Sequence, residues 1–180
     1  SDVEVILNLR DAWKYLLNNI DETFNLDFIC KINSYVSRNE SLEWGVLRNG
    51  KVGISGTDYI PEVPSKANVI EEINKIMDIK SVTERAIRYF LWGMRSQLFW
   101  DGNKRTSSLC ANKILICEGK GILSIQEKDI REFNIRLTEF YNTNDYSKID
   151  EFVYDKCIHG ISFQNEKDKE NIEQEDELEI

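Results

Sequence analysis

Apolar residues recur at intervals of three or four along most of this 180-residue chain, a spacing that places them on one face of an α-helix. The stretch of about residues 3–18 shows this with Val5, Leu9 and Trp13. The same pattern returns at roughly residues 21–38, 66–79, 81–97, 103–117, 126–141 and 146–158. Only two prolines and nine glycines are present, which disfavours a turn-rich β-sandwich. The sequence therefore predicts an all-α fold class.

Residues 44–59 follow a different pattern, because apolar and polar residues alternate there around Asn49-Gly50. Alternation with a period of two is typical of β-strands, and Asn-Gly is a strong signal for a two-residue hairpin turn. Pro61 and Pro64 then end any strand pairing. We therefore expect one exposed β-hairpin, with its turn at Asn49-Gly50, between the helices.

The negative charge of the chain is unevenly distributed. The formal net charge is −9, and residues 166–180 contain eight acidic and only two basic residues, so most of the charge lies in this tail. Neither part resembles a polycation that binds nucleic acid, and the expected partner is a protein or a small molecule. No apolar stretch reaches the ~20 residues of a membrane span, so no membrane association is expected. We expect residues 1–163 to form one domain and residues 164–180 to form a disordered acidic tail.

The cysteines indicate a reducing compartment. No Cys-x-x-Cys pair occurs among the four cysteines, and His159 is the only histidine, so a zinc site is not expected. Cys110 and Cys117 lie seven residues apart in a helical stretch and are expected to be buried on one face. Reduced thiols and the missing signal peptide together predict a cytoplasmic protein.

One segment carries a specific chemical signal, namely Gln97-Leu98-Phe99-Trp100-Asp101-Gly102-Asn103-Lys104-Arg105-Thr106 between two helical stretches. Gly102 permits a tight turn, and the first N–H groups of the next helix then point into the loop, where they favour an anion. Lys104 and Arg105 add positive charge, and Arg105 can hold two phosphate oxygens. Asp101 is suited to a Mg²⁺ that bridges phosphates. The residues predict a polyphosphate and magnesium site.

The same segment resembles the Fic motif, His-x-Phe-x-(Asp/Glu)-Gly-Asn-(Gly/Lys)-Arg. The matching residues are Phe99, Asp101, Gly102, Asn103, Lys104 and Arg105. Residues 45–61 resemble the flap hairpin that this family places upstream of the motif, and residues 140–141 and 157–160 also look similar. The resemblance covers roughly residues 40–163 and implies a Fic-type helical bundle with a short β-hairpin flap.

The resemblance also implies an activity. Most characterised Fic proteins transfer AMP from ATP to a hydroxyl of a target protein, so ATP with Mg²⁺ and a target Ser, Thr or Tyr hydroxyl are implied. Asp101 would hold Mg²⁺, and the implied phosphate ligands are Gly102, Asn103, Lys104, Arg105 and Thr106. The flap residues that would dock the target, by adding a strand to it, are Val52, Gly53 and Ile54. A regulatory or antitoxin-like protein is a further expected partner.

Two positions depart from the family pattern. Gln97 stands where the family has the histidine that deprotonates the attacking hydroxyl, and an amide has no pKa near 7. Loss of a general base typically costs ~10²–10⁴ in rate, so activity is expected to be weak, altered or lost. We expect His159 to be a structural residue late in a helix rather than a substitute base. The second departure is Ser108, where many AMP-transferring members have another arginine.

Three functions stay open from the sequence. The first is a Fic protein that binds nucleotide and has weak or lost AMP transfer. The second is a Doc-like protein kinase, because Lys104 without an arginine at Ser108 is closer to members that bind the nucleotide reversed. The third is a non-catalytic module that binds a protein through the edge of the flap hairpin.

Overall fold

The computed structural model describes residues 1–160. The helical prediction is confirmed there, and the expected domain end at residue 163 and the tail of residues 164–180 lie outside the described residues. Within residues 1–160, no helix is long and apolar enough to cross a membrane. The elements are α1 (Asp2–Asn18), α2 (Leu26–Val36), α3 (Lys66–Met77), α4 (Val82–Ser96), α5 (Asn103–Cys117), β1 (Ile122–Leu123), η1 (Glu127–Asp129), α6 (Ile130–Thr143), α7 (Ser147–Cys157) and β2 (Ile158–His159).

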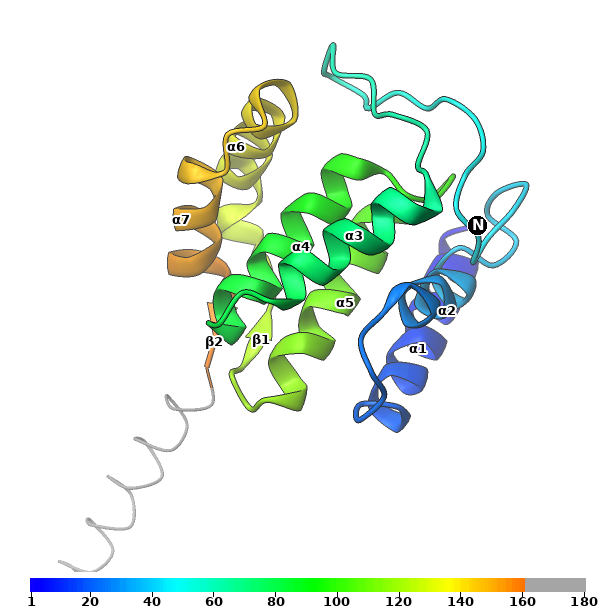
Figure 1. Cartoon of the computed structure of the whole chain (residues 1–180), viewed down its shortest axis with the longest axis horizontal. Coiled ribbons are helices and arrows are strands. Elements are labelled where there is room, and N and C mark those ends of the chain that lie inside the picture. The colour runs from blue at the N-terminus through cyan, green and yellow to red at the C-terminus, as the bar shows by residue number, and fades with distance from the viewer. Residues whose placement is uncertain (161–180) are drawn as a thin grey trace, which may run out of the picture.

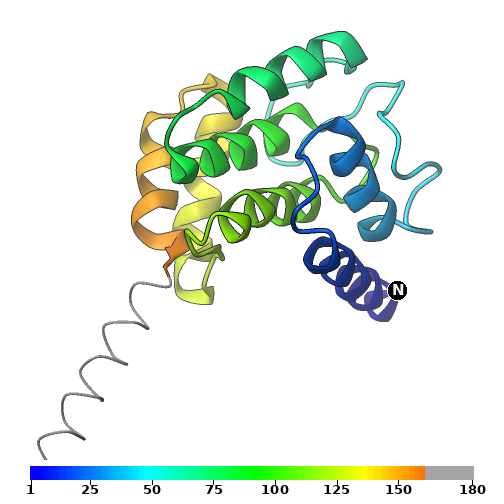
Figure 2. The same ribbon diagram turned by 60° about the horizontal axis from the view of Figure 1, so that its bottom comes forward.

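The centre of the molecule is the pair α4 and α5, joined by the short loop of residues 97–102. Figures 1 and 2 show α1 and α2 on one side of this pair and α6 and α7 on the other, with α3 beside α4. Ser81 caps α4, because its Oγ accepts from the Glu84 N–H at 3.3 Å. Because α4 and α5 are consecutive and joined tightly, the end of one and the start of the other meet at one place.

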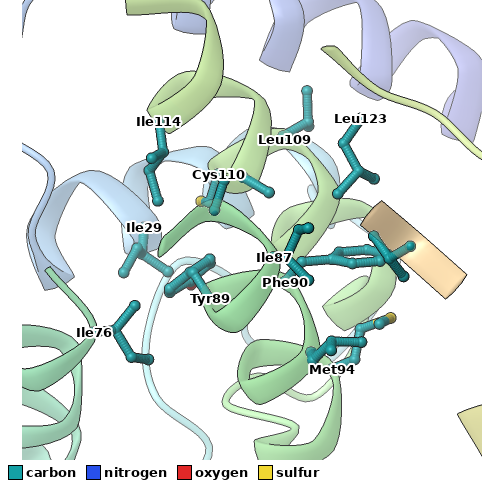
Figure 3. Packing of buried hydrophobic residues seen from close by; sticks show 14 of the residues in the cluster. Ile29, Ile76, Ile87, Tyr89, Phe90, Met94, Leu109, Cys110, Ile114 and Leu123 are labelled. Atoms are coloured by element: carbon teal, nitrogen blue, oxygen red, sulfur yellow. The ribbon is translucent and has the colours of Figure 1, made fainter. Parts of the chain in front are cut away.

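The hydrophobic core lies where α4 packs on α5. Figure 3 shows Tyr89 and Phe90 on α4 and Cys110 on α5, with Ile29 of α2 and Ile76 of α3 on the side of Tyr89. These five side chains are buried, as the amphipathic spacing of their helices predicts. This packing holds the end of α4 and the start of α5 in place on either side of the loop.

The predicted hairpin at Asn49-Gly50 is wrong. Residues 44–65, which we call the flap segment, contain no paired strand, and their turn lies instead at residues 54–57, where Thr57 N–H donates to the Ile54 carbonyl at 3.3 Å. Gly56 in that turn has φ +81°, a conformation that glycine adopts readily. The small antiparallel sheet is elsewhere: β1 pairs with β2, with Ile122 opposite His159.

The two helical cysteines differ in their surroundings. Cys110 is buried as expected, and burial raises the pKa of its thiol. Cys117 is exposed, so the expectation that both are buried is wrong. The reason is position, because Cys117 is the last residue of α5 and lies beyond the packed part of that helix.

Candidate phosphate-binding site

The loop between α4 and α5 reverses the chain within a few residues. Gln97 ends α4 in the left-handed region with φ 47° and ψ 58°, and Gly102 precedes α5 with φ +71°. The backbone N–H groups of the first three residues of α5 have no intrahelical acceptor, as at any helix start. Within residues 1–160, no side chain caps them either. These donors lie at the positive end of the helix, where the sequence predicts an anion cradle.

The side chain of Asn103 holds the loop in shape. Its Oδ1 accepts from the Phe99 N–H at 3.0 Å, and its Nδ2 donates to the Phe99 carbonyl at 2.8 Å and to Gln97 Oε1 at 3.1 Å. The amide is buried and its donors are already used within the loop. Asn103 can therefore serve a phosphate only through its backbone N–H.

Helix α2 supports the loop from behind. The carbonyl of Asp101 accepts from Asn33 Nδ2 at 3.1 Å and from Ser37 Oγ at 2.9 Å, and Asn33 Oδ1 accepts from the Gly45 N–H at 2.9 Å. Gly102 packs directly on this helix: a Cβ at this position would clash with Ser37 Oγ. Both the positive φ and this close approach require glycine at position 102.

The structure does not support Thr106 as a phosphate ligand. Its side chain is buried, with the hydroxyl oxygen 3.2 Å from Asn33 Nδ2, on the side of α5 that faces α2. Its backbone N–H already donates to the Gly102 carbonyl at 2.9 Å. Thr106 is the fourth residue of α5, and its N–H is the first in this helix that reaches a carbonyl one turn earlier. It therefore has no free N–H to offer a phosphate.

Asp101 and Arg105 form an ion pair at the open side of the loop. Arg105 Nη2 lies 3.2 Å from Asp101 Oδ2, and both side chains are partly exposed. Arg105 Nη1 is buried yet has no hydrogen-bond partner among the described residues. A buried donor without an acceptor is costly. The neighbouring side chain of Lys104 is exposed and adds positive charge.

Gln97 lies at the same opening but offers no titratable group. Its Nε2 donates to the Met94 carbonyl at 2.6 Å while its Oε1 accepts from Asn103. His159 belongs to β2, where its Nε2 lies 3.3 Å from the Ser124 carbonyl. β2 pairs with the strand that follows α5, so the ~20 Å length of that helix separates His159 from the loop. His159 is therefore not a substitute base, as expected, but the expectation that it lies late in a helix is wrong, because α7 ends at Cys157 and His159 is in β2.

A buried arginine fixes the flap segment to the loop. The Arg48 side chain is 1% exposed and donates to the backbone carbonyls of Gln97, Gly50 (2.7 Å), Glu62 (2.5 Å) and Ser96 (3.3 Å). Burial lowers the pKa of this guanidinium. Sequence reasoning missed this role, because all that the sequence shows is one arginine in an alternating stretch.

A cleft of about 550 Å³ connects the flap segment, the loop and α6. It brings together eight of the site residues expected from the sequence: Gly53, Ile54, Gln97, Asp101, Gly102, Asn103, Lys104 and Arg105. Val52 and Thr106 do not line it. The flap segment therefore reaches the phosphate loop as expected, although without strand pairing.

The far wall of the cleft comes from α6 and was not predicted. Asn134, Thr138 and Tyr141 line it, at the i, i+4 and i+7 spacing that places them on one helix face. Burial raises the pKa of Tyr141 to about 12, so its phenol stays neutral near pH 7. That spacing is visible in the sequence, but nothing local indicates that this face of α6 meets the loop.

These observations define a class of protein: a helical domain with a tight loop between two consecutive helices, at which the N–H groups that begin the second helix are free. The sequence pattern of the Fic/DOC family matches residues 23–115, which is more than half of the chain. The chain therefore belongs to the Fic/DOC family. No match was found among curated proteins.

Solved structures share this fold. Fic-1 (residues 134–508) from C. elegans is 19% identical with a TM-score of 0.66, over 84% of this chain and 46% of that one. A Fic domain containing signaling protein from Bacteroides thetaiotaomicron is 17% identical, with a TM-score of 0.58 over 84% and 63%. BepC, a VirB-translocated effector protein from Bartonella tribocorum with bound AMPPNP, is 16% identical, with a TM-score of 0.59 over 85% of both chains. This chain thus spans about half the length of the C. elegans chain.

Proposed function

We propose that this chain binds ATP with Mg²⁺ in the cleft and resembles protein adenylyltransferases, with AMP transfer that is weak, altered or lost. The observation that carries the proposal is the phosphate loop, complete in shape, beside Gln97 in place of a base. The positive side chains of Lys104 and Arg105, which line the cleft, support an anionic ligand there. The fold shared with BepC, whose structure has AMPPNP bound, supports a nucleotide.

Different residues of the site would bind the phosphates and the Mg²⁺. The backbone N–H groups at the start of α5 and the guanidinium of Arg105 would hold the phosphates. Asp101 fits a Mg²⁺ ligand, because its Oδ2 pairs with Arg105 while its Oδ1 has no protein partner among the described residues. Mg²⁺, when bound, would neutralise phosphate charge.

Removal of the proton from the target hydroxyl is the step that this site supports least. In AMP transfer the target hydroxyl oxygen bonds to the α-phosphorus, the bond from that phosphorus to pyrophosphate breaks, and the hydroxyl proton must leave. Gln97 is hydrogen-bonded at both ends of its amide and has no site that takes up a proton near pH 7. The proton therefore goes to water, which slows the step.

The acceptor would be a protein with a Ser, Thr or Tyr hydroxyl that docks on the flap segment. The backbone N–H groups of Val52 and Gly53 donate to no backbone carbonyl within residues 1–160, so an extended target chain could pair with them. Val52→Pro removes one such donor, while Val52→Ala keeps it. If the two variants label the target protein at the same rate, docking by backbone pairing is excluded.

A Doc-like kinase is the second candidate, and Ser108 favours it. This residue lines a mostly apolar pocket of about 250 Å³ next to Lys104 and Arg105, together with Leu9 and Trp13. Because this pocket has no third positive side chain, it suits the adenine ring better than a phosphate. Adenine bound there would place the nucleotide in the reversed orientation.

Labelled ATP separates the candidates. Protein, Mg²⁺ and cell lysate are incubated with ATP labelled either in adenine or in the γ-phosphate. Adenine label on a protein supports AMP transfer, and γ-phosphate label alone supports the kinase. The nucleotide proposal itself fails if ATP with Mg²⁺ gives no thermal shift and neither label is transferred, including by Gln97→His.

A further inference from the structure

A second concave surface runs along α4, on a face that shares only Leu98 with the loop. It consists of two adjoining pockets of about 440 and 460 Å³, which have four lining residues in common: Glu72, Trp92, Arg95 and Ser96. Helices α3 and α4, the start of α7 and residues 59–65 of the flap segment form its walls. We call this surface the α4 groove.

Two arginines in the α4 groove carry charge that no carboxylate neutralises. Arg88 lies over the Tyr146 ring and Arg95 over the Tyr59 ring, each 3.7 Å from the ring centroid. Within residues 1–160, neither has a carboxylate oxygen within 4.0 Å. A guanidinium stacked on a ring is held in place while its edge N–H groups remain available to an acceptor.

The acidic groups nearby do not change this result. Glu62 and Glu72 line the groove, and Lys75 pairs with Glu72 at 3.3 Å. Asp150 is partly buried near Arg88, and burial raises the pKa of its carboxyl more than Arg88 lowers it. With Lys75, Arg88 and Arg95 set against Glu62 and Glu72, the lining of the α4 groove carries one net positive charge, on a chain whose net charge is negative.

The spacing of the two arginines indicates the size of the ligand. Arg88 and Arg95 are two helical turns apart on one face of α4, about 10 Å along its axis. A single carboxylate or phosphate cannot reach both, whereas an extended peptide covers that distance in about three residues. Two acidic residues three or four positions apart would meet the two guanidiniums.

The other end of the groove is apolar and exposed. Ile60 is 65% exposed and Val63 is 43% exposed, and both line the pocket that also contains Arg95 and Trp92. Large apolar side chains that gather beside a charged groove are typical of protein-binding surfaces. Arg95 Nε also donates to the carbonyl of Tyr141, whose side chain lines the phosphate cleft, so the two surfaces adjoin.

We propose that the α4 groove binds an acidic, partly apolar segment of a partner protein in extended form. Carboxylates of the segment contact Arg88 and Arg95, and its apolar side chains cover Ile60 and Val63. Charge complementarity selects this partner, because a basic or neutral segment would leave both guanidiniums unpaired. The interaction does not require nucleotide or catalysis.

The test uses two fluorescein-labelled peptides, Glu-Ala-Leu-Glu-Ala-Leu-Glu and its counterpart with Gln at each Glu position. Fluorescence polarisation measures affinity, and NMR of the four tryptophan indole N–H groups locates the peptide, with Trp92→Phe identifying the signal. We expect the Glu peptide to bind about tenfold more tightly than the Gln peptide, and to shift the Trp92 signal. Equal affinities, or a shift of Trp100 without Trp92, would overturn the proposal.

Matched variants separate specific contacts from net charge. Arg88→Gln with Arg95→Gln should lower the affinity for the Glu peptide about tenfold. Lys128→Gln with Arg131→Gln removes the same charge at exposed positions outside the groove and should change it less than about twofold. Equal losses in both pairs contradict the proposal. If the Arg88→Gln and Arg95→Gln protein unfolds, Arg88→Lys with Arg95→Lys replaces it. The absence of a Trp92 shift in the unaltered protein then overturns the proposal.

Discussion

Asn103 Nδ2 donates to Gln97 Oε1 at 3.1 Å, and Gln97 Nε2 donates to the Met94 carbonyl at 2.6 Å. The side chain at position 97 thus connects the last turn of α4 to the first residue of α5. The loop keeps its tight turn and the free N–H groups at the start of α5 with an amide in this place. Binding and proton transfer are therefore separable properties of this site, and they can be tested one at a time.

Gln97→His should increase AMP transfer to a target protein by about 10²–10⁴-fold, because an imidazole can accept the hydroxyl proton near pH 7. The rate of labelling from adenine-labelled ATP measures this gain. Gln97→Ala is the control and should stay at the level of the unaltered protein. A gain that is the same with alanine would contradict a role in proton transfer.

Arg105→Ala should weaken ATP binding by about tenfold or more, since hydrogen bonds to charged groups contribute roughly 1.5–3 kcal/mol. Isothermal titration with ATP and Mg²⁺ measures the affinity. Arg131→Ala, an exposed arginine of α6, is the control for net charge. Unchanged affinity in Arg105→Ala would mean that the nucleotide does not use this guanidinium.

Gly102→Ala should destabilise the protein by roughly 1–2 kcal/mol from the positive φ alone, with a further loss from the clash with Ser37 Oγ. Urea unfolding measures the change. Ser37→Gly in the same chain removes the closer of the two contacts, while Val36 Cγ1 at 2.8 Å remains, and should recover part of the loss beyond its own effect. Full additivity of the two substitutions would show that the close approach at α2 is unimportant.

Arg48→Lys should destabilise the protein by about 1–3 kcal/mol, because an ammonium group reaches fewer of the carbonyls that the guanidinium now satisfies. Chemical denaturation provides the free energy of unfolding. Lys51→Ala, an exposed residue of the same segment, should have little effect. A neutral result at Arg48 would rule out the proposed attachment of the flap segment.

Asp150→Asn should raise the melting temperature by roughly 1–3 °C at pH 7. Burial raises the folded-state pKa of this carboxyl above its ordinary 3.8, so its charged form is disfavoured in the folded protein. The stability that protonation provides is complete below pH 3.8 and is lost as pH rises through the folded pKa. The difference between the two proteins should therefore shrink toward pH 3.8. Asp155→Asn on the same helix is the exposed control.

The sequence predicts those parts of the molecule that depend on local physics. Helices follow from apolar spacing, and Gly102 and the start of α5 follow from the rules for helix ends. The turn of the flap segment was misplaced because local preference at Asn49-Gly50 is outweighed by Arg48, whose guanidinium donates to the Gly50 and Glu62 carbonyls. Asn33 and the α6 wall were missed for a similar reason, since their partners are distant in the chain.

The place of Arg48 also matters for the electrostatics of phosphate binding. Two helix ends of opposite polarity meet at this loop, and the unpaired carbonyls at the end of α4 would by themselves repel an anion held by α5. The Arg48 guanidinium donates to the Ser96 and Gln97 carbonyls and so screens that negative end. A residue that never touches the nucleotide would thus decide whether the loop presents a net positive field to it.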